Sequence, residues 1–277
     1  DLATIDLGGF ASLALDALVR LRTRNTMDDG LMVESVARAL LNTAAPRPSI
    51  ETLLHAFIPL DWVDHSHADA ILALTNQPSG LSVVRDVFAE DVGIVPYIKP
   101  GFALSKAAAD VYGANPSAEG LILEKHGLVT FGESARESYE RHIELVSRAE
   151  KMIRKARGMQ PRGRERTPKA AADLSTRLRG RLSCRKRMIL RFDGTSRVRR
   201  FVDRDDVVEI SQHGPATPDH VLRTKRLPIV LQSYESGDIV RGINNYEDKY
   251  RAYVARYAGD ASSLMHDPGP RVVLAPG

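Results

Sequence analysis

The stretch Asp64-His65-Ser66-His67-Ala68-Asp69 indicates both the fold and the chemistry of this chain. It follows the apolar run Ile58–Val63, which predicts an extended strand. Side chains at positions i and i+2 of a strand point to the same face, so His65 and His67 can bind one ion at about 2.0–2.1 Å. The H-x-H pattern also arises by chance, so the spacing alone leaves both interpretations open.

A third histidine, His126, follows the apolar run Leu121–Leu123 and precedes Gly127. An H-x-H strand and a distant histidine can form a three-histidine site with an open coordination position. Such a site is typical of a catalytic metal that polarises a carbonyl oxygen. Chemistry beside a carbonyl also needs groups that transfer protons. Glu51, expected on the helix before the histidine strand, and Tyr97, at the end of a later strand, are the candidates.

The composition is that of a soluble globular protein, with 277 residues, 43% hydrophobic and 27% charged. No apolar run approaches the roughly 18–20 residues of a membrane span, so no membrane partner is expected. The single cysteine, Cys184, excludes an internal disulfide framework and fits a reducing, cytoplasmic location.

The basic residues are concentrated in one part of the chain. Residues 151–200 hold 18 Lys and Arg against three acids, although the whole chain has a net charge of only +4. The rest of the chain is therefore acidic. A linker, an insertion or a solvated helix is the favoured interpretation of the basic segment. Nucleic-acid binding is the alternative, and no nucleic-acid partner is expected.

Hydrophobic periodicity predicts strands alternating with helices, which is typical of an α/β protein. A strand is expected at Gly93–Tyr97, and a single strand is expected to run from Leu121 to Gly132. Short β-like runs are expected at Met188–Phe192 and Val198–Val202, and a rigid loop at Gly214–His220. Helices are expected at Phe10–Leu21, Asp28–Leu41, from Pro48, Ala68–Thr75, Val83–Phe88, Gly101–Tyr112, 134–157 and Asn245–Tyr257.

Four patterns together resemble the class II (zinc) aldolase/adducin family of sugar-phosphate aldolases. They are Glu51…His55, His65-Ser66-His67, Pro96-Tyr97-Ile98-Lys99-Pro100-Gly101 and His126-Gly127-Leu128, in the family's order within residues 50–150. The resemblance implies a three-layer α/β/α domain (adducin-head-like) with a central, largely antiparallel sheet. We expect this core at 1–157, a basic insertion or small subdomain at 158–210, and a C-terminal extension at 211–277.

The resemblance also implies roles for individual residues. His65, His67 and His126 would bind Zn²⁺, and Glu51 would be the catalytic acid/base. Tyr97 matches a family tyrosine that acts as an acid, often from a neighbouring subunit, so a homo-oligomer is expected. Glu124 and His55 are interpreted as structural.

A closer resemblance links VDHSHADAILALTNQP, GESARESYERHIELVSRAE, HGPATPDHVLRTKRLP and DPGPRVVLAPG to the amino-terminal part of bifunctional polypeptides. These join a rhamnulose-1-phosphate-type aldolase to a short-chain dehydrogenase, and NAD would belong only to the latter. The implied reaction cleaves a ketose 1-phosphate to dihydroxyacetone phosphate and an aldehyde such as lactaldehyde. The family's phosphate-binding loop is expected upstream of Asp1, and Arg223 and Lys225 are candidate phosphate or substrate contacts.

Two other functions stay open for this family. The same scaffold supports epimerases and dehydratases, which also use three histidines. An adducin-like binding module would have no catalytic function, and would have no need of the histidines and Glu51.

Overall fold

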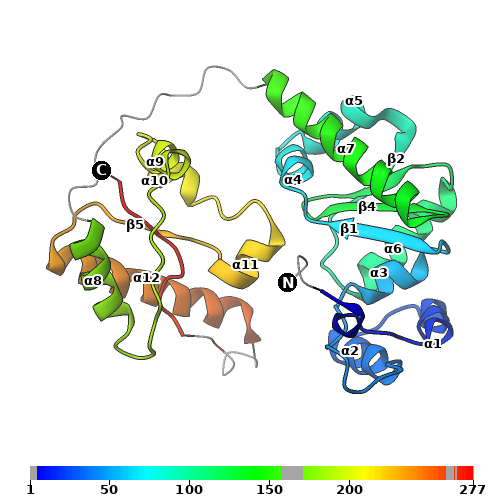
Figure 1. Ribbon diagram of the computed structural model, residues 1–277, viewed down its shortest axis with the longest axis horizontal. Helices are drawn as coiled ribbons and strands as arrows, with labels where there is room; N and C mark the ends of the chain where they lie inside the picture. Colours follow the sequence, from blue (N-terminus) through cyan, green and yellow to red (C-terminus); the bar gives the residue numbers. More distant parts are fainter. Residues whose placement is uncertain (1–4, 157–170, 260–264, 266, 277) are drawn as a thin grey trace. The chain divides into compact units, whose positions relative to one another are not determined.

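The computed structural model describes residues 5–156, 171–259, 265 and 267–276 (Figure 1). The chain divides into two compact units, Asp1–Arg157 and Gly158–Gly277. The first unit contains a four-stranded sheet in the order β1-β4-β3-β2. Strand β4 is antiparallel to both of its neighbours, and β2 is parallel to β3. The strands are β1 (Trp62–Ser66), β2 (Val92–Val95), β3 (Gly120–Leu123) and β4 (Gly127–Gly132).

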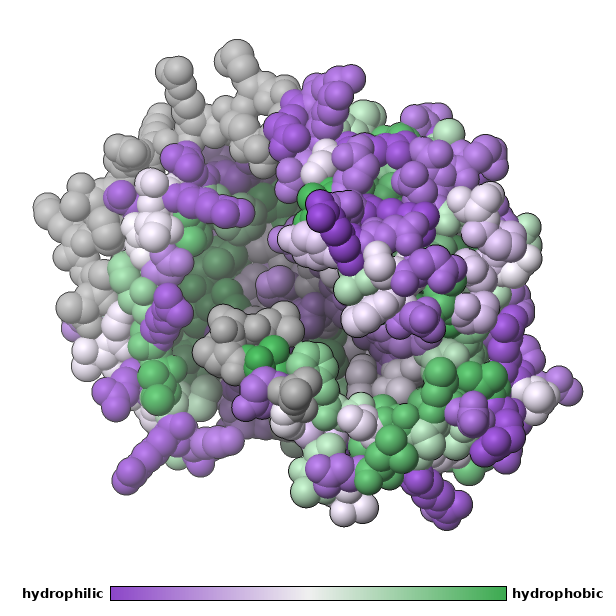
Figure 2. All heavy atoms as spheres, turned by 45° about the vertical axis from the view of Figure 1, so that its right-hand side comes forward, coloured by the Kyte–Doolittle hydropathy of each residue, from purple (hydrophilic) through white to green (hydrophobic). Residues whose placement is uncertain are grey.

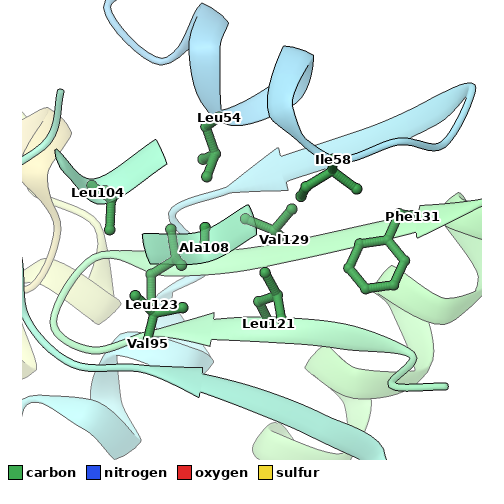
Figure 3. Close-up of a cluster of buried hydrophobic side chains, with 9 residues drawn as sticks. All are labelled: Leu54, Ile58, Val95, Leu104, Ala108, Leu121, Leu123, Val129 and Phe131. Carbon is green, nitrogen blue, oxygen red and sulfur yellow. The ribbon is translucent and has the colours of Figure 1, made fainter. Parts of the chain in front are cut away.

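One face of this sheet packs against α3 (Thr52–Phe57) and α6 (Phe102–Ala114). Alternating strand residues supply the contacts, because successive side chains point to opposite faces. Figure 3 shows Leu121 and Val129 from the sheet beside Leu54 and Ala108 from the two helices. Burial of each large aliphatic side chain contributes about 1.5–3 kcal/mol.

The other face packs against α4 (Asp69–Thr75), α5 (Gly80–Phe88) and α7 (Ala135–Ala156). Ile122 and Leu128, which alternate with the residues of the first face, meet the buried Leu145 of α7 there. Helices on both faces of a mostly antiparallel sheet confirm the predicted three-layer α/β/α fold.

The short helices at the start of the chain extend the layer that contains α3 and α6. A separate core joins Leu18 and Met32 to Phe57 and Phe102. The helices are η1 (Leu7–Gly9), α1 (Leu15–Val19), η2 (Arg20–Thr23) and α2 (Asp29–Arg38), and η3 (Ala89–Asp91) lies between α5 and β2. On the face shown in Figure 2, hydrophilic side chains cover much of this first unit, with smaller hydrophobic patches among them.

The second unit is mainly helical around a two-stranded parallel sheet of β5 (Ile229–Val230) and β6 (Val273–Leu274). Its core joins Leu174 and Leu178 to Ile229, Ile239 and Ile243. These residues come from both sides of position 210, and the division of the chain there stays a prediction. The helices are α8 (Ala171–Leu182), α9 (Ser196–Val202), α10 (Val207–Ser211), α11 (Pro218–Thr224) and α12 (Ser236–Tyr257).

Across both units, the described helices include none with the length and hydropathy needed to cross a bilayer.

The single strand expected from Leu121 to Gly132 is wrong. A turn at Glu124–His126 separates β3 from β4 and reverses the chain. The turn is closed by a hydrogen bond from His126 N to Leu123 O of 3.1 Å, and Lys125 adopts a positive φ of 55°. The apolar pattern is the same on both sides of the turn, so periodicity alone does not show the reversal.

Other local expectations also need correction. Val198–Val202 belongs to helix α9, whose two valines four residues apart share one helix face, while Met188–Phe192 has no regular structure. The helix expected at Phe10–Leu21 shortens to α1, and η2 continues from it. The loop expected up to His220 ends earlier, because Pro218 starts α11. The basic segment 151–200, interpreted as a linker, an insertion or a solvated helix, lies partly outside the described residues, and its described part includes α8.

Candidate metal centre

Four side chains that are distant in the sequence converge at one end of β1. His65 lies on the strand and His67 directly after it, His126 closes the β3–β4 turn, and Glu51 immediately precedes α3. One ligand atom from each of the four lies within 4.8 Å of the other three. The side chains of His65 and His126 are only 6% and 3% exposed, whereas those of His67 and Glu51 are each 18% exposed. Solvent therefore reaches the cluster from the side of His67 and Glu51.

The ring nitrogens of the three histidines point toward one another. His67 Nε2 lies 3.2 Å from His65 Nε2 and 3.0 Å from His126 Nε2. Glu51 Oε1 lies 2.6 Å from His126 Nε2, 3.4 Å from His65 Nε2 and 3.6 Å from His67 Nε2. Tetrahedral zinc ligands at 2.0–2.1 Å are about 3.3–3.4 Å apart. The donor spacing is thus close to that of a zinc site.

A hydrogen bond on the far side of His65 prepares its Nε2 to bind a metal. His65 Nδ1 lies 2.8 Å from the carbonyl oxygen of Leu128, which can only accept a proton. The proton therefore sits on Nδ1, and the lone pair of Nε2 faces the cluster. This contact, together with three nitrogen donors and one carboxylate, makes the cluster a suitable zinc site.

The histidines also set the charge of Glu51. Burial opposes ionisation of this carboxyl, but its close contacts with His126, His65 and His67 outweigh burial and hold its pKa well below its ordinary value. Glu51 is therefore a carboxylate at neutral pH. It lies where a fourth ligand or an incoming substrate oxygen would sit.

Gly127 permits the close approach of β1 and β4 at this point. A Cβ atom added to Gly127 would lie 2.3 Å from Ser66 O and 3.1 Å from His65 Cε1. Both contacts are shorter than ordinary van der Waals distances, and the first is to rigid backbone. The glycine after His126 is therefore required by the packing of the ligand strand itself.

Tyr97 is not part of the four-residue cluster. It follows β2, its side chain is 58% exposed, and its backbone N donates a 3.0 Å hydrogen bond to Glu124 Oε2. Glu124 thus ties the Tyr97 segment to the turn that carries His126. His55 is also outside the cluster, because its Nδ1 contacts the carbonyl oxygen of Val63 at 2.9 Å.

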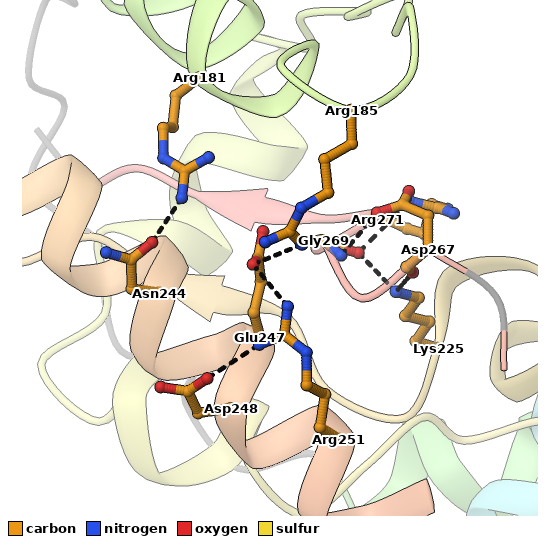
Figure 4. A network of polar contacts seen from close by, with 10 residues as sticks. All are labelled: Arg181, Arg185, Lys225, Asn244, Glu247, Asp248, Arg251, Asp267, Gly269 and Arg271. Atoms are coloured by element: carbon orange, nitrogen blue, oxygen red, sulfur yellow. Dashed lines mark hydrogen bonds and ion pairs between the residues drawn. The ribbon is translucent and has the colours of Figure 1, made fainter. Parts of the chain in front are cut away.

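Arg223 and Lys225 lie in the second unit. Arg223 is exposed on α11. Lys225 Nζ donates 2.5 Å hydrogen bonds to the carbonyl oxygens of Asp267 and Gly269 (Figure 4). It also lies 4.0 Å from the ring centre of Tyr250. These contacts give Lys225 a structural function, since they hold the segment before β6. Its use as a phosphate contact, and that of Arg223, stays a prediction.

The described part of the second unit includes cavities of about 480 and 510 Å³, lined by residues of that unit alone. Neither Arg223 nor Lys225 lines them.

The sequence also matches known protein families. Residues 17–153 match the family described as "Class II Aldolase and Adducin N-terminal domain", and residues 169–277 match "Aldolase class II, second domain". The chain belongs to the class II aldolase and adducin family. The Glu51 and histidine cluster therefore lies in the part that matches the family's N-terminal domain, whose members typically bind zinc and sugar phosphates and form oligomers.

Two individual proteins resemble this chain, and the first of them supports the assignment. The N-terminal class II aldolase domain of a conserved Thermoplasma acidophilum protein is 40% identical, with a TM-score of 0.52, over 55% of this chain and 70% of that one. "Uncharacterized oxidoreductase YuxG" of Bacillus subtilis (strain 168) is 35% identical over 294 residues. That alignment covers all of this chain and 42% of the Bacillus protein.

Proposed function

We propose that this class II aldolase family member cleaves a ketose 1-phosphate in a zinc-dependent retro-aldol reaction. The products would be dihydroxyacetone phosphate and an aldehyde such as lactaldehyde. The observation that carries the proposal is the convergence of His65, His67 and His126 on one point with the Glu51 carboxylate beside it. An acid/base group next to three neutral nitrogen donors suits proton transfer beside a polarised carbonyl.

His65, His67 and His126 would hold the zinc ion, which as a Lewis acid would polarise the substrate carbonyl. In the reaction the C3–C4 bond breaks, the C4 hydroxyl loses its proton to give the aldehyde, and C3 gains a proton. We assign the proton at C3 to Glu51. Glu51 Oε1 lies 2.6 Å from His126 Nε2, so this carboxylate already lies at the proposed reaction centre. A substrate that enters the site would displace it.

Tyr97 is proposed to exchange the proton on the C4 oxygen, which becomes the aldehyde oxygen when the C3–C4 bond breaks. Its exposed side chain supports action in a neighbouring copy of the chain, which would make the active enzyme a homo-oligomer. We also propose, from the resemblance to bifunctional polypeptides, that the native polypeptide carries an NAD-dependent dehydrogenase domain. The Bacillus relative is named an oxidoreductase, and this chain covers 42% of its length.

Glu51 favours an enzyme over an adducin-like binding module. A binding module has no reason to keep a partly buried carboxylate and three histidines in contact. Epimerase and dehydratase reactions use the same groups, and they are separated from aldol cleavage by the products formed.

Metal analysis combined with product detection tests the proposal. Purified protein should contain about one zinc per chain, and His65→Ala should lose both zinc and activity. His55→Ala is the matched control, because it removes a neighbouring histidine outside the cluster and should retain zinc. Glu51→Gln should keep zinc and lose about 10²–10⁴-fold in cleavage rate.

Dihydroxyacetone phosphate released from rhamnulose 1-phosphate and related ketose 1-phosphates is the activity readout. A wild-type protein that binds no zinc after incubation with the metal would overturn the proposal. If the protein binds zinc but forms an epimerised or dehydrated product, its reaction is epimerisation or dehydration and not aldol cleavage.

A further inference from the structure

Helix α7 is tied to the ligand strand by polar side chains. Ser138 Oγ donates a 2.6 Å hydrogen bond to Asp64 Oδ2, and His142 Nε2 lies 2.6 Å from Ser66 Oγ. His142 Nδ1 lies 2.8 Å from Thr130 Oγ1 on β4. Ser138 and Thr130 are fully buried. One imidazole therefore bridges β1 and β4 from the face of the sheet opposite the side chain of His65.

The spacing of the two elements matches along this contact. Asp64 and Ser66 are two residues apart on a strand, which is about 6.6–6.8 Å. Ser138 and His142 are four residues apart on a helix, which is a rise of about 6 Å. Helix α7 therefore contacts β1 at two successive positions. A shift of either element along its axis would break both hydrogen bonds.

Among the described strands, β1 lies at the edge of the sheet and pairs with β4 on one side, so a contact with α7 adds support that a central strand would obtain from a second strand. Ser66 stands between His65 and His67, so a displacement of Ser66 moves both histidines. Metal sites tolerate errors in ligand distance of about 0.2 Å. A hydrogen bond that fixes Ser66 therefore acts on the geometry of two ligands at once.

We propose that His142 is a positioning residue for the metal centre and acts through Ser66. The inference rests on the proposed zinc site and adds to it a residue outside the ligand set. His142→Ala should weaken zinc affinity about 10–100-fold, as loss of a group that orients metal ligands does. It should also shift the visible absorption spectrum of the Co²⁺-substituted protein, which reports coordination geometry.

Two amide substitutions separate the two bonds of His142. The glutamine amide reaches about as far as Nε2, and the asparagine amide about as far as Nδ1. His142→Gln should therefore keep the contact to Ser66 and restore most of the zinc affinity. His142→Asn should keep only the contact to Thr130 and bind zinc as weakly as His142→Ala.

Arg148→Ala is the matched control on the same helix. Arg148 ties α7 to Asp91 at 2.8 Å and to the carbonyl oxygen of Val87 at 2.8 Å, away from β1. This variant should lower the melting temperature and leave zinc affinity and the Co²⁺ spectrum unchanged.

The experiment measures zinc dissociation constants by chelator competition, with Co²⁺ spectra and melting temperatures of the same samples. Equal zinc affinity in wild type and His142→Ala overturns the inference, as does an equal loss in Arg148→Ala. If His142→Ala does not fold, the order of His142→Gln and His142→Asn decides, and equal affinities overturn the inference. A wild-type protein that binds no zinc instead overturns the proposed function.

Discussion

Replacement of Gly127 by alanine tests whether the approach of β1 and β4 determines the metal centre. The new Cβ would lie 2.3 Å from Ser66 O, whereas ordinary van der Waals contacts begin at 3.4 Å. The two strands must therefore separate by about 1 Å, because close-packed backbone has no free space to absorb the methyl group.

This displacement exceeds the tolerance of about 0.2 Å on metal–ligand distances several-fold. It also strains the 2.8 Å contact between His65 Nδ1 and Leu128 O. We expect zinc affinity to fall at least about 10–100-fold. Overpacking should destabilise the first unit by about 1–3 kcal/mol. Each kcal/mol corresponds to a melting temperature lower by about 2–4 °C.

Chelator competition and thermal unfolding of the metal-free protein measure the two effects separately. Gly113→Ala is the control, since a Cβ added there meets nothing within 4 Å on helix α6. That variant should bind zinc normally and be as stable as wild type, or more stable by about 0.4–1 kcal/mol. If Gly127→Ala matches wild type in both zinc affinity and melting temperature, the strand spacing does not control the site.

Two other measurements test the cores of the two units. Leu145→Ala removes a fully buried side chain between α7 and the sheet and should cost about 2–5 kcal/mol in urea unfolding, and a loss below 1 kcal/mol would contradict the packing. Burial, with the nearby Arg271, lowers the pKa of Lys225 from 10.5 to about 8. Between pH 8 and pH 10.5 the unfolded chain therefore binds more protons than the folded chain, and the free energy of unfolding should rise with pH. Burial raises the pKa of Tyr246 from 10.0 to about 12. Between pH 10 and pH 12 the folded chain therefore binds more protons than the unfolded chain, and the free energy of unfolding should fall as the pH rises. The free energy of unfolding, measured with urea at increasing pH, should no longer rise in Lys225→Met and should no longer fall in Tyr246→Phe. A variant whose pH dependence matches that of the wild type would refute the corresponding assignment.

Short sequence patterns mark the four side chains that meet in the cluster, although their functions stay predictions. The H-x-H spacing predicts that His65 and His67 share one face, and the apolar run before His126 predicts a buried strand beside it. The local structure was less predictable. Glu51 precedes α3 instead of lying within it, and His126 lies in a turn. Both details depend on tertiary packing that periodicity does not encode.

His142 was missed because its pattern is that of an ordinary amphipathic helix. Its neighbour Val146 packs against the core, whereas Ile143 is exposed, and the partners of His142 are 12 and 76 positions away in the sequence. Ser138, four residues earlier on the same helix face, is the sequence feature that could indicate a polar contact of His142. A histidine and a serine at helical spacing on a buried face need polar partners, and only the folded sheet shows which ones.

The wide separation of the metal donors along the chain has a consequence for folding. His67 and His126 are 59 positions apart, and Glu51 and His126 are 75 apart. An ion bound by both histidines would act as a cross-link that closes a long loop. A covalent cross-link of that span raises the free energy of the unfolded chain by about 4 kcal/mol, because the chain loses entropy. A chain that kept its ion while unfolded would refold with β1 and the β3–β4 turn already adjacent. The slow encounter of these distant segments would then be shortened, so that the same four side chains would influence the folding rate as well as the chemistry.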